Sequence, residues 1–229
     1  MKKTRRMHLT KDEVESILTV ARKDSKRNWC ALVLALNHGC RVSELAGGRK
    51  ESYKTVNGVT KHIPAMLPLQ LTDIDFKNKQ NTIRRLKGSR DTTQPFINHR
   101  GKPLLSDESA IREYLAERID DGSGLLFTGQ KGPLSRWTLD EMFKKYCREA
   151  SAQRVEKGFP AIPEEAMHFH TIRHTTGTFI SSTPDATVFK TAAWLGHANV
   201  QNAQIYWHPD SRAIGSYVQQ SMVRTFAGL

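Results

Sequence analysis

Residues 28–38, with the sequence NWCALVLALNH, constrain the fold most because they are apolar on nearly every side of a helix. A helix with this pattern is normally buried inside a globular domain. Gly39 follows directly, at the position where a left-handed residue commonly ends a helix. We therefore expect a central buried helix, with the rest of the chain packed around it and Arg41 just beyond its rigid end.

Other helices are predicted from their caps and their apolar spacing. Thr10 and Glu13 have the spacing of a capping box and begin a helix that runs to about residue 23. Ser43 and Glu44 start a short helix. Further helical segments are expected at residues 106–119 with Ser106 or Asp107 as cap, 135–154, 170–181, 184–195 closed by Gly196, near 206 and after 210.

A few segments have the pattern of strands. Alternation around Asn57-Gly58 predicts a projecting β-hairpin within residues 47–68. Residues 81–86 and 92–97 are two further strand candidates joined by a turn at residues 87–91. The prediction is an α+β fold, mostly helical with a small antiparallel sheet, in one domain over residues 9–229 that follows a flexible basic arm at residues 1–8.

Charge favours a nucleic-acid partner, because 35 lysines and arginines against 23 acidic residues give a net charge of +12. No apolar run is long enough for a membrane span, and the N-terminus lacks the apolar stretch of a signal peptide. We expect a cytoplasmic, nucleoid-associated protein, or one in the host cytoplasm if it is viral. Cys30, Cys40 and Cys147 are widely spaced and odd in number, which predicts reduced structural thiols.

His170, Arg173 and His174 would share one face of a helix. A helix that starts near His170 would add free backbone N–H groups for an anion. With His197 and Tyr206 they form a set of cationic, imidazole and phenol groups that suits phosphoryl transfer on a phosphodiester. The alternatives are a solvated helix face, or a zinc site at His170 and His174. The HExxH pattern of zinc proteases has a glutamate where this chain has Thr171, which disfavours zinc.

These segments, taken in order, resemble the catalytic domain of the tyrosine recombinases, the phage integrase family. The resemblance rests on Arg41 within GCRVSEL, Lys87 in a turn, the box from His170 to His174, Leu195-Gly196-His197, and Tyr206 nine residues later. It extends over about residues 9–208. The short N-terminus is also similar to that of the fimbrial phase-switch invertases, so we expect no N-terminal core-binding domain.

The resemblance implies a role for each residue, with no metal or cofactor. Tyr206 would attack a DNA phosphodiester to give a 3′-phosphotyrosine, and His170 would act as its base. Arg41, Arg173 and His197 would bind the phosphate oxygens, and Lys87 would protonate the leaving 5′-oxygen. His174 and Glu44 would support them. Further candidates for DNA contacts are Arg84, Arg85, Arg90, Arg136, Lys54 and Lys61. The hairpin that carries Lys54 and Lys61 would either touch DNA or a partner, or be a tolerated surface insertion.

The function implied is site-specific DNA recombination, by which a DNA segment is integrated, excised or inverted. A type IB-like topoisomerase and a non-catalytic DNA-binding regulator are the alternatives. The implied partners are double-stranded DNA, a homotetramer on two DNA sites and an accessory DNA-bending or directionality protein. Residues 210–229 have near-helical apolar spacing and would pack in cis or on a neighbouring protomer.

Overall fold

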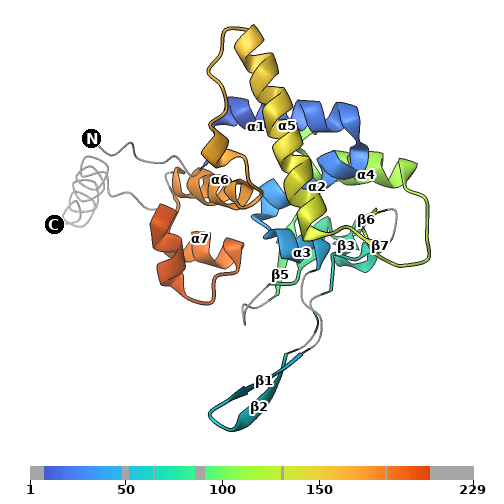
Figure 1. Ribbon diagram of the computed structural model, residues 1–229, viewed down its shortest axis with the longest axis vertical. Coiled ribbons are helices and arrows are strands. Elements are labelled where there is room, and N and C mark those ends of the chain that lie inside the picture. The colour runs from blue at the N-terminus through green and yellow to red at the C-terminus, as the bar shows by residue number, and fades with distance from the viewer. Residues whose placement is uncertain are drawn as a thin grey trace, which may run out of the picture.

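The computed structural model describes residues 8–47, 52–63, 65, 67–85, 91–129, 132–183 and 185–206. Within these ranges the fold is mostly helical with small antiparallel sheets (Figure 1), as the sequence predicts. The α-helices are α1 (Lys11–Asp24), α2 (Lys26–His38), α3 (Val42–Ala46), α4 (Asp107–Glu117), α5 (Arg136–Glu156), α6 (His170–Ser181) and α7 (Val188–Leu195). Short 3-10 turns are η1 (Leu71–Asp73), η2 (Pro103–Leu105), η3 (Glu164–Ala166) and η4 (Val200–Tyr206).

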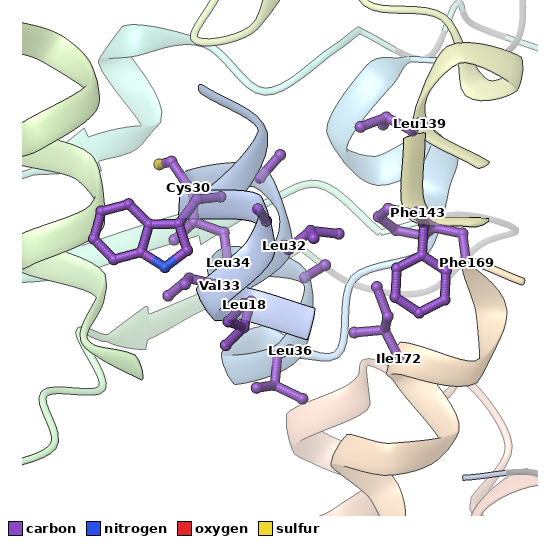
Figure 2. Packing of buried hydrophobic residues seen from close by; sticks show 14 of the residues in the cluster. Leu18, Cys30, Leu32, Val33, Leu34, Leu36, Leu139, Phe143, Phe169 and Ile172 are labelled. Atoms are coloured by element: carbon purple, nitrogen blue, oxygen red, sulfur yellow. The ribbon is translucent and has the colours of Figure 1, made fainter. Parts of the chain in front are cut away.

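Helix α2 is the centre of the core and packs against α1, α4 and α6. Trp29, Val33 and Leu34 have no exposed surface. Figure 2 shows α2 with Phe143 of α5 and Ile172 of α6 on one side. The predicted buried helix is confirmed, although it begins two residues earlier because Ser25 caps it at Lys26.

Most other helix predictions are confirmed within a few residues. The capping box of Thr10 and Glu13 starts α1, and α6 has the predicted bounds. Helix α7 begins at Val188 rather than at residue 184, because the side chain of Thr187 accepts a hydrogen bond from the amide of Lys190 and caps the helix there. Pro184 and residues 207–229 lie outside the described part of the chain.

The predicted hairpin consists of β1 (Ser52–Val56) and β2 (Val59–Ile63) and extends away from the helical body (Figure 1). Asn57 and Gly58 both have left-handed φ angles, 52° and 77°, as a type I′ turn requires. Lys54 and Lys61 are cross-strand partners in its register.

A second sheet has the order β3-β4-β5, with β3 (Ile74–Asp75), β4 (Gln80–Ile83) and β5 (Thr92–Pro95). Strand β4 ends earlier than predicted because the next two residues, Arg84 and Arg85, turn to Asp73 and Glu44. Of the turn predicted at residues 87–91, only Asp91 lies within the described residues. The strands β6 (Thr128–Gly129) and β7 (Gly132–Pro133) were not predicted, since two residues are too few to show alternation.

The cysteines are buried and free, as predicted. Burial raises the pKa of Cys40 to about 12, so its thiol stays protonated. In the ranges that the structure describes, no helix has both the length and the apolar character needed to cross a membrane.

Helices α2 and α7 each end in a left-handed glycine, and these two ends meet. Gly39 has a φ of 58° and Gly196 a φ of 63°. A Cβ atom on Gly39 would lie 2.3 Å from Cδ2 of Leu195, the last residue of α7. Gly39 therefore serves both the turn and the close approach of the two helices.

Replacing Gly39 with alanine is expected to lower the free energy of unfolding by about 2–5 kcal/mol, because left-handed strain costs about 1–2 kcal/mol and overpacking about 1–3 kcal/mol. Gly101→Ala is the matched control, since Gly101 has a φ of 75° but a Cβ there would meet no described heavy atom within 4 Å. Urea unfolding measures both losses. If the free energy of unfolding fell equally in the two variants, the steric contribution at Gly39 would be contradicted.

Candidate active site

Four segments of the chain bring the predicted reactive residues together. Arg41 precedes α3, α6 carries its three predicted residues, His197 follows α7, and Tyr206 is the last residue of η4. Predicted Lys87 and Arg90 lie outside the described residues.

Two histidine rings lie against the ring of Tyr206, and a third packs behind one of them. The ring centroids of His174 and Tyr206 are 5.8 Å apart, and His197 stacks on Tyr206 at 6.5 Å with an interplanar angle of 15°. His170 contacts His174 edge to face at 4.6 Å. His174 thus packs between His170 and the phenol, and its supporting role stays a prediction.

Gly177 on α6 makes room for Tyr206, a role that the sequence prediction missed. A Cβ atom on Gly177 would lie 2.6 Å from Cζ of Tyr206, so the phenol ring rests directly on the helix backbone. The available signal was a glycine inside a helical pattern, which usually has a packing reason.

The two predicted phosphate-binding arginines differ in exposure. Arg173 is 1% exposed, and its guanidinium donates to the carbonyl of Gly39 at 2.6 Å and to that of Leu195 at 2.8 Å. The Arg41 side chain is 24% exposed and pairs with Oε1 of Glu44 at 2.7 Å. Arg41 therefore has the more accessible guanidinium, while the guanidinium of Arg173 is buried against the carbonyls of Gly39 and Leu195.

Glu44 is buried and accepts bonds from the backbone amide and guanidinium of Arg41 and from Arg85. Burial by itself would raise the pKa of this carboxyl, but Arg85, Arg41 and Arg173 outweigh it and hold the pKa below its usual value. Glu44 is therefore ionised near neutral pH and partly offsets the charge of the arginines.

Desolvation and neighbouring cations shift the pKa values of the reactive groups. Partial burial, then His174 and Arg173, lower the pKa of His170 to about 4. Burial, then Arg173 and Arg41, lower the pKa of His197 to about 4. Burial raises the pKa of Tyr206 against the opposing charges of Arg173 and Arg41. At neutral pH the site therefore holds neutral imidazoles that can accept a proton and a protonated phenol.

Two predictions about this site are wrong. The side chain of Arg85 is fully buried and pairs with Glu44, so it does not face DNA as predicted. The start of α6 also does not present a row of free amides, because the N–H groups of Phe169, Thr171 and Ile172 already donate to Asp140, His168 and Phe169. The turns before α6 thus satisfy the groups that an anion would need.

The other basic candidates have different surroundings. Arg84 forms a bidentate pair with Asp73 and its side chain is 30% exposed. Arg136 is exposed at the start of α5, beside a hollow of about 560 Å³ lined also by Trp137 and His170. As for the zinc alternative, no third metal-ligating residue joins His170 and His174 in the described ranges.

Solved structures with the same fold are recombinases and integrases. The crystal structure of XerA recombinase superposes with a TM-score of 0.63 at 21% identity, covering 93% of this chain and 64% of that one. A Tn1549 transposon integrase in complex with circular intermediate DNA gives a TM-score of 0.68 at 20% identity, covering 96% of this chain and 67% of that one. The fold is that of this class of catalytic domains.

Sequence relatives agree with the fold. Tyrosine recombinase XerA of Pyrococcus furiosus is 27% identical over 223 residues, 96% of this chain and 63% of XerA. Type 1 fimbriae regulatory protein FimB of Escherichia coli K12 is 26% identical over 216 residues, 91% of this chain and 86% of FimB. The chain spans 51% of the related recombinase XerC of Caldanaerobacter subterraneus. The chain belongs to the phage integrase family, whose model matches residues 63–212.

The depressed pKa values predict how stability depends on pH. An unfolded histidine binds a proton below a pH of about 6.5, whereas folded His170 and His197 bind one only near pH 4. The unfolded state therefore takes up more protons in this window, and the free energy of unfolding should fall as the pH drops from 7 to 5. Urea unfolding at several pH values measures the fall, which should be smaller in His197→Gln. NMR signals of both rings that titrate above pH 6 in the folded protein would contradict this.

Proposed function

We propose that this chain is a site-specific DNA recombinase that cleaves and rejoins DNA through a 3′-phosphotyrosine at Tyr206. The observation that carries the proposal is the packing of one phenol among neutral histidines beside two arginines. Membership of the phage integrase family and relatives named tyrosine recombinases support it.

In the reaction, Oη of Tyr206 attacks the phosphorus and the bond from phosphorus to the 5′-oxygen breaks. The phenol proton passes to His170 by way of His174, whose ring lies between the two, and the leaving 5′-oxygen takes a proton from Lys87. The new ester conserves the energy of the broken bond. A 5′-hydroxyl of another strand can then attack the phosphotyrosine and release Tyr206 without ATP.

The arginines stabilise the charge that develops on the phosphorane. Arg41 is accessible, so its guanidinium can turn from Glu44 to the non-bridging oxygens. Burial and the charge of Arg41 lower the pKa of Arg173 to about 10, which keeps it cationic at neutral pH. Its bonds to Gly39 and Leu195 fix its orientation before DNA binds. His197 supplies a further hydrogen bond to the phosphate.

DNA would reach this site along basic residues at its rim. Arg136 is exposed beside His170 and is the best placed of the described candidates. Lys54 and Lys61 are Cα partners in the hairpin register and would be further DNA contacts. Arg84 would contribute through the part of its side chain that Asp73 leaves exposed. Arg90, which lies outside the described residues, would be a further DNA contact.

The active assembly would be a homotetramer on two DNA sites, with an accessory DNA-bending or directionality protein. Residues 210–229 would connect neighbouring protomers through their apolar positions. A solved relative, XerH, is described as bound to its difH substrate before cleavage, which supports DNA as the partner.

A suicide DNA substrate carrying the cognate site tests the chemistry. The wild-type chain should form a covalent protein–DNA adduct visible on a denaturing gel, whereas Tyr206→Phe should form none because the nucleophilic oxygen is missing. Tyr114→Phe is the control: this tyrosine is also buried, and its hydroxyl donates to the carbonyl of Leu126. An adduct that persists in Tyr206→Phe would rule out this nucleophile.

Recombination differs from topoisomerase action in its need for two sites. We expect strand exchange between two linear DNA molecules that each carry the site, with a rate that rises steeply with protein concentration because several protomers assemble. Product analysis by electrophoresis measures the exchange. Relaxation of supercoiled DNA by a monomer, with no exchanged product, would favour the topoisomerase instead.

A further inference from the structure

The fully buried Arg85 joins several parts of the molecule. Its guanidinium donates to Oε2 of Glu44 at 2.9 Å, to the carbonyl of His38 at 3.0 Å and to the carbonyl of Trp194 at 2.8 Å. Its Nε donates to the hydroxyl of Thr92 at 3.1 Å. A side chain that is fully buried and bonded in this way cannot serve as a contact to DNA, so its charge must act inside the protein.

Arg85 and Arg173 together clasp the ends of two helices. Arg85 bonds the carbonyls of His38 and Trp194, and Arg173 bonds the next carbonyl in each case, Gly39 and Leu195. Backbone carbonyls at a helix C-terminus carry partial negative charge and favour a nearby cation. The two guanidinium groups therefore hold the ends of α2 and α7 side by side.

A residue of the proposed site follows each of these two helix ends in the chain. Beyond α2, Gly39 is followed two residues later by Arg41, whose guanidinium is held by Glu44. Beyond α7, Gly196 is followed by His197, whose amide donates to the carbonyl of Ala192 at 2.8 Å. Arg85 is thus bonded both to the partner of Arg41 and to the turn that places His197.

Gly196 leaves the space that Arg85 occupies. A Cβ atom on Gly196 would lie 2.7 Å from Cγ and 2.9 Å from Cδ of Arg85. The Leu195-Gly196-His197 turn is therefore packed against this arginine as well as bonded to it. The backbone amide of Arg85 donates to Oδ1 of Asp91 at 3.1 Å.

We infer that Arg85 is a positioning residue for DNA cleavage, which orients Arg41 through Glu44 and His197 through the end of α7 without touching DNA. This role rests on the proposed function. A lysine cannot replace it, because one ammonium group lacks the planar fork that reaches a carboxylate and two carbonyls at once. A lysine does keep the positive charge beside Glu44, so Arg85→Lys is the variant most able to fold.

The experiment compares single-turnover cleavage of the suicide substrate by the wild-type chain and Arg85→Lys. Cleavage should slow by about 10- to 100-fold, as expected when reactive groups are misplaced by about 1 Å. Affinity for uncleaved DNA and its salt dependence should stay within about threefold, since a lost phosphate contact would reduce the salt slope by about 1. Arg118→Lys is the matched control, because Arg118 has a side chain only 6% exposed and bonds Asp120, Asp121 and the carbonyl of Leu125. Its cleavage rate should remain that of the wild type.

A substrate with a neutral methylphosphonate at the scissile position separates positioning from a general folding defect. Without the non-bridging negative charge, cleavage depends less on Arg41. The ratio of the wild-type cleavage rate to that of Arg85→Lys should therefore be at least fivefold smaller on this substrate. Any of three results would overturn the inference: the same rate ratio on both substrates, a wild-type cleavage rate in Arg85→Lys, or a weaker salt dependence of DNA binding in that variant. A wild-type chain that forms no adduct would instead refute the proposed function, and the role of Arg85 with it.

Discussion

The meeting of two helix ends determines the geometry of the site. Helices α2 and α7 both point their C-termini at the same place, where unpaired carbonyls would be costly to bury. Arg85 and Arg173 supply donors to four of these carbonyls, and Glu44 partly offsets their charge. Two left-handed glycines allow the approach. Because Arg41 and His197 follow these glycines within two residues, their positions depend on a rigid and buried arrangement.

The same arrangement accounts for the protonation states. Cations are concentrated around a partly dehydrated cluster of histidines, so imidazolium is disfavoured twice, by desolvation and by repulsion. A phosphate entering the site would reverse the second effect, because its negative charge favours the protonated ring. If His170 is the base, as proposed, it is a weak base in the free protein and a stronger one beside a bound phosphate.

The sequence predicted the features that depend on local pattern. The buried helix before Gly39, the bounds of α6 and the Asn57-Gly58 turn each follow from neighbouring residues. Arg85 could not be assigned in this way. Next to Lys87 in a basic stretch it has the pattern of a DNA contact, and only the tertiary structure brings Glu44 and the end of α7 to it. The fit of Tyr206 on Gly177 likewise joins residues whose separation in sequence carries no periodic signal.

Burial also changes how the two proposed phosphate ligands should be interpreted. Removing Arg173 would leave the carbonyls of Gly39 and Leu195 without their donor, so any loss of activity would combine structural and catalytic effects. Arg41 is partly exposed, and Glu44 would keep Arg85 as its partner after Arg41 is removed. The loss of activity after substitution of Arg41 should therefore reflect catalysis more directly than the loss after substitution of Arg173. The difference between the two arginines follows from building an anion site at helix C-termini. The buried cation is needed to bond the backbone carbonyls there, and only the exposed cation can exchange its protein partner for a phosphate.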